Sequence, residues 1–422
     1  MTSTFSWLDH SEAQRRQMLE VIDLFREKGT LDELGFGPIR DAFSDHFFPG
    51  TSTLHTRARY LLFVPWIYRR IEQDRIPPAH VESRARKDQA ALARALQLGG
   101  EGDAQGVIGI QAGEALQRTP KAIYWTALRR FRIWRFPGSI EQYHTVIRRP
   151  GTSGAPAYSD DGELVERSGV QGWHAGLPQE PEGLLQAARL ALRKEEAEYL
   201  RERIVVEAPG SLLSLCIESK RSVSRIQYPW LHPELAAFPA HLRAELEHAR
   251  RFSVLAYGAA LLYNLMLAEK AEAADLPVAN GLVELRRSEL NAWANDGGAM
   301  RDLRTWRMND LWRTVVDKGH RIPYPARQFV EGIAETVHAD PKRFADHAVA
   351  RRMILLRESA LKGGLARLST RRALERFTGA AGGVEPTPRW SGSPGPAGGF
   401  RHCLGWTGAP RGAAPCFRRG GR

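Results

Sequence analysis

An uncharged run of nine residues constrains the fold of this chain more than any other stretch. The run extends from Tyr60 to Tyr68 within TSTLHTRARYLLFVPWIYRR. A helix that is apolar on every face has to be surrounded by other elements of the fold. Nine residues are also too few to cross a bilayer, which takes about 17 or more. The sequence therefore predicts a helix buried inside a globular domain.

Two arginines, Arg57 and Arg59, stand directly before the run. We expect the helix to begin at Thr51–Thr53 and to continue to about Gln73, with a kink or break at Pro65 because proline cannot donate a helical hydrogen bond. Residues two apart on a helix point roughly 200° from each other. The two arginines therefore cannot serve one site side by side.

A guanidinium beside a surrounded helix needs a carboxylate or carbonyl partner, because an unpaired buried charge is very costly. We therefore predict that Arg59 is mostly buried and paired, and that it ties helices together. The alternative is an anion site for a phosphate group. Such a site would be formed by Arg57 or Arg59 with the hydroxyls of Thr51–Thr53 and the helix N-terminus.

Helical periodicity dominates the rest of the chain, and no strand pattern alternates cleanly over a useful length. The fold class is predicted as mostly α, with one helical lobe over residues 1–148 and a second over residues 179–381. Between them, residues 149–178 contain six Gly and three Pro and are predicted as a loop or linker. In the second lobe we expect an amphipathic helix over Pro181–Ile204 and a buried helix over Phe252–Ala268.

A basic and aromatic helix forms the second half of a helix-turn-helix-like region over residues 111–136. Thr119 suits its cap and Pro120 its first position. Arginine with exposed aromatic rings suits phosphate contact and base stacking, and the candidate binding residues are Lys121, Arg129, Arg130 and Arg132, followed by Arg135. The alternative is an ordinary amphipathic helix with solvated arginines, whose core-facing residues are Ile123, Ala127, Leu128 and Phe131.

The charge balance favours acidic partners, since 60 Lys and Arg against 48 Asp and Glu give a net charge of +12. Three cysteines form neither a disulfide framework nor zinc-finger spacing, which suits a reducing cytoplasm. The sequence has no signal-peptide pattern, phosphate-binding loop, dinucleotide-binding motif or metalloprotease motif. We therefore expect a cytoplasmic protein with no membrane partner, no metal and no cofactor, and the sequence identifies no catalytic residue.

Residues 382–422 differ in composition from the sequence before them. They contain eleven Gly and six Pro, with six Arg and Glu385 as the single acidic residue. Such a segment has too little apolar periodicity to offset the entropy lost on ordering, so we predict a disordered tail. Two origins stay open: a shifted reading frame in a GC-rich gene, and a basic arm that touches nucleic acid.

Four strings carry a resemblance to a known family: FSWLD at Phe5–Asp9, FPGTSTLHTRARYLLFVPWIY, AIYWTALRRFRIWRFPGSI and HARRFSVLAYGAALLYNLMLAE. Over most of residues 1–380 the chain resembles the bacterial domain of unknown function 6361. The resemblance implies no activity, cofactor or catalytic residue. Members resemble accessory proteins encoded beside helicases or nucleases in bacterial defence or mobile regions, which implies a partner of that kind.

Three functions are compatible with these observations. The leading hypothesis is a non-enzymatic bacterial accessory that binds DNA or RNA, or a helicase or nuclease, with phage defence as one setting. The main alternative is an enzyme that acts on a phosphate-containing substrate through Arg57 and Arg59. A third is a structural assembly partner. Whether the chain is an enzyme stays open at this point.

Overall fold

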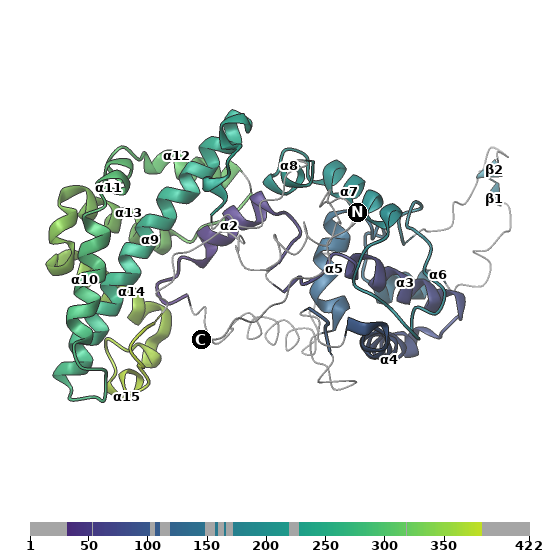
Figure 1. Cartoon of the computed structure of the whole chain (residues 1–422), viewed down its shortest axis with the longest axis horizontal. Helices are drawn as coiled ribbons and strands as arrows, with labels where there is room; N and C mark the ends of the chain where they lie inside the picture. Colours follow the sequence, from purple (N-terminus) through teal and green to yellow (C-terminus); the bar gives the residue numbers. More distant parts are fainter. Residues whose placement is uncertain are drawn as a thin grey trace, which may run out of the picture. The chain divides into compact units, whose positions relative to one another are not determined.

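The computed structural model describes residues 32–52, 54–101, 106–109, 119–147, 157–158, 164–165, 172–218, 228–317 and 319–381. Their fold is mostly α-helical, as the periodicity predicts (Figure 1). They divide into two compact units. Unit 1 contains the residues up to Ala42 and those from Glu247 onward, and unit 2 contains Phe43–Leu246.

Unit 2 is built from short helices, and α2 (Gly37–Phe47) leads into it. Two-residue strands β1 (Ala157–Tyr158) and β2 (Leu164–Val165) pair antiparallel. The further helices are α3 (Tyr60–Gln73), α4 (Pro78–Leu96), the π-helical η1 (Gln97–Glu101), α5 (Pro120–Arg130), α6 (Ile140–Ile147), α7 (Lys194–Glu207), α8 (Leu212–Glu218) and the 3-10 helices η3 (Pro229–Leu231) and η4 (Leu235–Ala237).

Unit 1 is organised around the long helix α9 (Ala240–Ala273), whose first residues belong to unit 2. The remaining elements of unit 1 are α10 (Leu282–Ala294), α11 (Gly297–Arg304), α12 (Met308–Asp317), α13 (Tyr324–Ala339), η5 (Pro341–Asp346), α14 (Ala348–Lys362), η6 (Gly363–Leu365) and α15 (Arg371–Leu374).

The apolar run forms the core helix of unit 2, as predicted. Every residue from Tyr60 to Tyr68 is buried in α3. The helix continues through Pro65 without a break. Its surroundings include the ring of Tyr124, which stacks on Tyr60 with the centroids 5.2 Å apart. A helix without a polar face is thus enclosed on all sides by its neighbours.

The start predicted for this helix is wrong, because α3 begins at Tyr60 and not at Thr51–Thr53. The Tyr124 hydroxyl accepts from the N–H groups of Thr56 and Arg57 at 2.8 and 3.0 Å. It donates to the Arg57 carbonyl at 2.8 Å. These bonds satisfy the backbone in a turn, so the segment has no need of helical bonds. Thr53 lies outside the described residues.

The predicted lobe boundary at 149–178 does not coincide with the division between the units. Both points of division fall inside helices, α2 and α9, so no Gly- or Pro-rich linker marks them. The end of the predicted linker packs back onto α3 instead. Trp173 Nε1 donates to a Glu72 carboxylate oxygen at 2.8 Å, and Trp66 Nε1 donates to the Pro178 carbonyl at 2.7 Å.

The helix predicted over Pro181–Ile204 is shorter than expected, since α7 begins at Lys194. The residues before it run against the end of α4. The Ala188 N–H donates to the Ala95 carbonyl at 2.9 Å, and the Leu190 N–H donates to a Glu101 carboxylate oxygen at 3.0 Å. These long-range bonds replace the helical bonds that the local pattern favours.

The apolar stretch Phe252–Ala268 lies in α9 and is mostly buried, as predicted. Among the described residues, α9 alone has the length and apolar composition to cross a membrane, yet most of its apolar window is buried within the fold. A core helix meets the same criteria of length and composition.

Part of the helix-turn-helix-like region and the whole predicted tail lie outside the described residues, namely 111–118 and 382–422. The second helix of the region is confirmed. It is α5, with Pro120 in its first position and the Thr119 hydroxyl oxygen accepting from the Ala122 N–H at 3.4 Å.

Candidate functional site

Arg59 is a structural clamp in unit 2, as one of the two sequence hypotheses predicts. Its exposed fraction is 5%. One terminal nitrogen is 2.7 Å from a Glu196 carboxylate oxygen, and the other donates to the Arg189 carbonyl at 2.7 Å. The guanidinium also lies over the Phe63 ring, 5.4 Å from its centroid. The positive charge is therefore matched inside the core by a carboxylate at the start of α7.

The phosphate site proposed around Arg57 and Arg59 is not assembled. Arg57 is half-buried and donates to the Thr56 carbonyl at 3.2 Å. The Thr51 hydroxyl donates to the Phe48 carbonyl at 2.8 Å. Because α3 begins at Tyr60, its N-terminus does not coincide with the threonines.

The aromatic side chains of α5 and the turn after it belong to the core. Tyr124, Phe131 and Trp134 are buried. Trp125 is half-buried against Trp134, with the ring centroids 5.0 Å apart. Three of the four rings are therefore not available for stacking on bases, and three of the positions expected to face the core are buried: Ala127, Leu128 and Phe131.

Lys121, at the other end of α5, is held by acidic neighbours. Its ammonium is 2.7 Å from a Glu82 carboxylate oxygen and 3.3 Å from one of Glu141. It also lies over the Tyr68 ring, 5.7 Å from the centroid. Burial alone would lower the pKa of Lys121, but Tyr68 and the two carboxylates raise it above its ordinary value. The Lys121 ammonium is thus already paired with carboxylates of the fold.

Four exposed arginines are close in sequence at and just after the C-terminal end of α5, and we call them the arginine surface: Arg129, Arg130, Arg132 and Arg135. One acidic residue of α7, Glu207, meets two of them. Its carbonyl accepts from Arg130, and its carboxylate is 3.3 Å from Arg132 Nε. That carboxylate is shared with the buried Arg203. Arg129 and Arg135 form no ion pair with a described residue.

Arg132 occupies a backbone conformation that normally selects glycine. Its φ is +49°, in the left-handed region. The Ile133 N–H donates to the Leu128 carbonyl at 3.0 Å, and the Arg132 N–H donates to the Arg129 carbonyl at 3.1 Å. This is a Schellman motif, in which glycine is the usual residue at the left-handed position. An arginine there costs about 1 kcal/mol or more.

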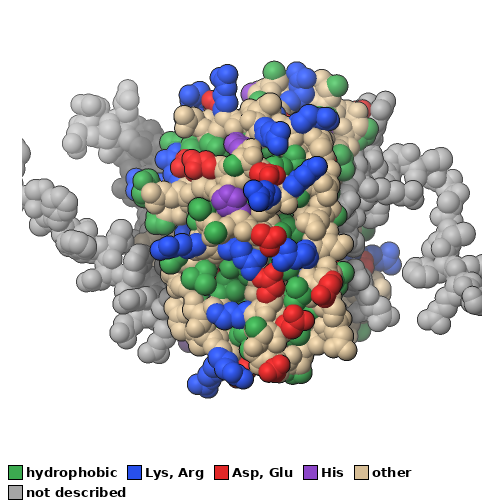
Figure 2. Space-filling view, turned by 90° about the vertical axis from the view of Figure 1, so that its left-hand side faces the viewer, with side chains coloured by type: hydrophobic (Ala, Val, Ile, Leu, Met, Phe, Trp, Pro, Cys, Tyr) green, Lys and Arg blue, Asp and Glu red, His purple; other side chains and the backbone are tan. Residues whose placement is uncertain are grey.

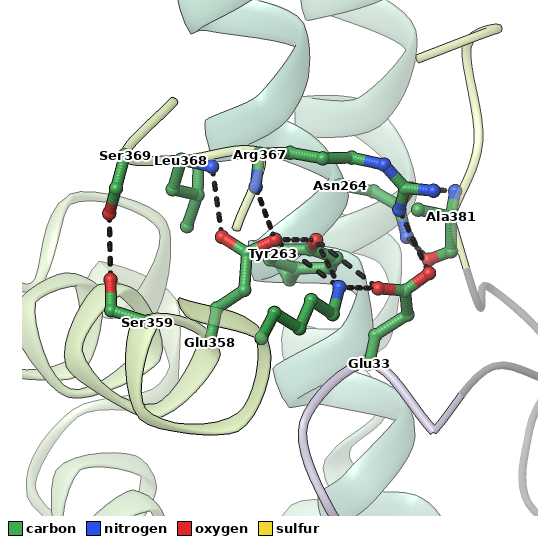
Figure 3. Close-up of polar contacts among 10 residues, drawn as sticks. Glu33, Tyr263, Asn264, Glu358, Ser359, Arg367, Leu368, Ser369 and Ala381 are labelled. Carbon is green, nitrogen blue, oxygen red and sulfur yellow. Dashed lines mark hydrogen bonds and ion pairs between the residues drawn. The ribbon is translucent and has the colours of Figure 1, made fainter. Parts of the chain in front are cut away.

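Unit 1 contains a buried cluster of charged side chains that the sequence did not indicate (Figure 3). Glu358 of α14 is fully buried, and its carboxylate accepts from the backbone N–H groups of Arg367 and Leu368 at 2.8 and 2.9 Å. It also accepts from the Tyr263 hydroxyl. Glu33 pairs with Lys362 and, at 2.8 Å, with Arg367.

This cluster has the composition of an acid–base site, but its polar atoms are used within it. Burial, and then the Arg367 charge, lower the pKa of Lys362 to about 8. The charge of Asp32 acts in the opposite direction on this pKa, and the ammonium of Lys362 is paired with the carboxylates of Glu33 and Glu358. Burial raises the pKa of Tyr263. We therefore assign the cluster to structure, where it ties Glu33 to α9 and α14.

The described residues contain no group of three His, Cys, Asp or Glu that is arranged to hold a metal ion. Two parts of the site could not be found by sequence pattern. The partner of Arg59 lies 137 residues away in the chain. The left-handed conformation of Arg132 could not be predicted either, because the residue type that usually indicates it is glycine and not arginine.

Comparison with known proteins gives a family without an assigned activity. No curated protein and no solved structure matches the chain. The family of unknown function DUF6361 matches residues 2–396, which is most of the chain. Residues 397–422 lie beyond the match, and the two origins considered for the tail stay predictions. The chain belongs to the DUF6361 family.

Proposed function

We propose that this protein is a non-enzymatic accessory that binds DNA or RNA through the arginine surface. The observation that carries the proposal is the group of four exposed arginines at the end of α5. Guanidinium groups bind phosphate oxygens well, because their planar fork matches the geometry of the anion. Binding of this kind releases counterions and falls steeply as the salt concentration rises.

The proposed contacts are to phosphates and not to bases. Most of the rings that could stack on bases are buried, as Phe131 and Trp134 show, and Trp125 is half-buried. Phosphate contacts position a protein on nucleic acid but carry no direct sequence information. We therefore expect binding to a range of sequences with similar affinity.

A structural explanation covers only part of the arginine surface. Basic residues in the last turn of a helix interact favourably with its dipole, by about 0.3–1 kcal/mol. This explains Arg129 and Arg130, which are in the last turn of α5. Arg132 and Arg135 lie past the end of the helix, and Arg132 adopts the left-handed conformation.

One face of unit 1 offers a contrast. In Figure 2, blue and red side chains are interspersed over this face. Mixed charges of this kind produce little net field for a polyanion, because attraction and repulsion alternate over short distances. The proposal therefore assigns binding to unit 2.

An enzyme that acts through Arg57 and Arg59 has less support. The Arg59 charge is neutralised by Glu196, and the Arg57 guanidinium donates to a neighbouring carbonyl. Both groups would have to leave these partners before they could bind a substrate phosphate. The cost of leaving Glu196 unpaired in the core is about 3–5 kcal/mol.

The test is a titration of a labelled duplex and a labelled single strand by fluorescence anisotropy, between about 50 and about 200 mM salt. The double variant Arg129→Ala with Arg132→Ala should bind more weakly, and its salt slope should be lower by about 1 for each phosphate that is no longer neutralised. The matched control is Arg301→Ala with Arg304→Ala, which removes two exposed arginines from the last turn of α11 in unit 1.

The control pair should bind like the wild type. Unchanged affinity and slope in the Arg129 and Arg132 variant, at an unchanged melting temperature, would contradict the proposal. Equal losses of affinity in the two double variants would also contradict it, because they would show a diffuse charge effect and not a defined surface.

A further inference from the structure

One polar side chain lies inside the apolar part of α9. Asn264 is 2% exposed. Its side-chain oxygen accepts from the Ala381 N–H at 2.7 Å, and its side-chain nitrogen donates to the Ala381 carbonyl at 2.8 Å (Figure 3). The same nitrogen donates to the Ala260 carbonyl at 2.9 Å. A residue in a strand exchanges the same two bonds with its partner strand, so Asn264 binds the backbone of Ala381 and not its side chain.

A second side chain, Arg286 of α10, holds the same stretch of chain. Its Nε and one terminal nitrogen donate to the Gly379 carbonyl at 3.2 and 2.8 Å. Its other terminal nitrogen donates to a Glu289 carboxylate oxygen at 2.6 Å, which orients the guanidinium. We call residues 379–381 the strap, and Asn264 with Arg286 the strap site. Four hydrogen bonds join the two, and all four reach backbone atoms of the strap.

The strap has small residues at the two positions that the strap site holds. Gly379 has a φ of +105°, a conformation that favours glycine. Ala381 is 6% exposed, so a charged side chain at this position would be buried at a high cost. The strap site therefore selects a peptide with glycine at one position and a small uncharged residue two positions later.

The strap site needs an occupant, but its four hydrogen bonds do not depend on any side chain of the strap. A buried amide that lacks a partner costs about 1–3 kcal/mol. Every peptide carries N–H and C=O groups that can supply the partners. Ala380, between the two bound residues, is exposed, so the strap is held from one side. Another peptide can therefore take its place without the loss of a hydrogen bond.

We propose that the strap site is a peptide-binding site, which the chain's own strap occupies in this structure and which a partner's segment with the same two small residues can occupy instead. Main-chain hydrogen bonds supply the affinity in recognition of this kind, and side-chain positions supply the selectivity. The tethered strap has an effective concentration in the millimolar range, so it keeps weak ligands out. The site lies in unit 1, and the proposal is independent of nucleic-acid binding by unit 2.

Saturation-transfer NMR on the full chain with the peptide acetyl-Thr-Gly-Ala-Ala-amide tests the proposal. The peptide has the sequence of residues 378–381. Two variants open the site by displacing the strap: Ala381→Asp places a charge at the buried position, and Gly379→Val disfavours the backbone conformation. Both should transfer saturation to the peptide. The apparent Kd of the wild type should be about tenfold or more higher, because only molecules with an open site bind.

The controls change the site and the peptide separately. Asn264→Leu in the Ala381→Asp background should abolish the transfer, and the matched peptide acetyl-Thr-Val-Ala-Ala-amide should give none. The strap contains no helix or strand, so the displaced variants should keep the circular dichroism spectrum of the wild type.

Four results would overturn the proposal. The first is no transfer in either strap-displaced variant, and the second is an equal Kd in the wild type and these variants. The third is transfer that persists with Asn264→Leu, which would place the peptide elsewhere. The fourth is equal binding of the valine peptide, which would show that the site does not select small residues.

Discussion

Two segments of unit 2 place arginines next to aromatic side chains, and their guanidinium groups have opposite environments. Arg59 is buried against Glu196 and the Arg189 carbonyl. The arginine surface, from Arg129 to Arg135, is exposed while the rings beside it are buried. The comparison shows that the same pattern of residue types holds a paired guanidinium in the core in one place and exposed guanidinium groups at the surface in the other. Burial of the guanidinium, and not its sequence neighbourhood, separates the two roles.

The largest difference between the two segments should be in stability. Arg59→Ala leaves Glu196 buried without its partner, so the free energy of unfolding should fall by about 3–5 kcal/mol. Arg129→Ala, at an exposed position in the last turn of α5, should change it by no more than about 1 kcal/mol. Thermal unfolding of both variants by circular dichroism measures the difference.

A second substitution separates the charge from the packing. Glu196→Gln in the Arg59→Ala background removes the unpaired carboxylate and should recover part of the stability that Arg59→Ala removes. If Arg59→Ala melts at the same temperature as Arg129→Ala, the clamp does not contribute to the fold and the contrast between the segments disappears.

The half-buried carboxylate of Glu72 forms no ion pair with a described residue, and it extends the comparison to a negative charge. Glu72 accepts a hydrogen bond from Trp173 Nε1 at 2.8 Å, and burial raises its pKa to about 7. In the unfolded chain the pKa is near its ordinary value of about 4.5. The protonated form is thus preferred by the fold, and this contribution is complete below about pH 4.5 and is lost as the pH rises through 7.

Glu72→Gln should therefore raise the stability of unit 2 at pH 8 by about 1–3 kcal/mol, with little effect at pH 4.5. Glutamine keeps an oxygen that can accept from Trp173. Urea unfolding of the wild type and the variant across this pH range checks the expectation. A constant difference between them at all pH values would show that Glu72 does not titrate between the two pH values.

The local signals in the sequence were enough to predict several elements. The run from Tyr60 to Tyr68 predicts a buried helix because nine uncharged residues leave it no polar side, and Thr119 with Pro120 predicts the start of α5. The buried pairing of Arg59 also followed from the sequence, because a charge inside a core needs a partner. The identity of that partner did not follow, since Glu196 is brought in by tertiary packing.

Distant contacts override local preference at the positions where the sequence predictions were wrong. The threonine-rich sequence predicts a helix start at Thr51–Thr53, but hydrogen bonds to Tyr124 hold Thr56 and Arg57 in a turn. The division between the units lies inside α2 and α9, where composition does not change. The cluster around Glu358 escaped notice because its members are single charged residues spread from Glu33 to Arg367.

The arginine surface contains one residue that permits a direct test of its role. Arg132 and Arg75 are both exposed, and both occupy the left-handed position after a helix, with φ of +49° and +53°. At Arg75 the Ile76 N–H donates to the Ile71 carbonyl at 3.2 Å, which is the same motif. Glycine at either position should relieve a similar strain and raise stability by about 0.5–1 kcal/mol.

The measurement is the affinity of Arg132→Gly and Arg75→Gly for a labelled duplex at low salt, together with their unfolding free energies. Both variants should be more stable than the wild type. Only Arg132→Gly should bind more weakly, with a salt slope lower by about 1, because the variant neutralises one phosphate fewer. Wild-type affinity in Arg132→Gly, or an equal loss of affinity in Arg75→Gly, would contradict the claim that the arginine surface is the nucleic-acid interface.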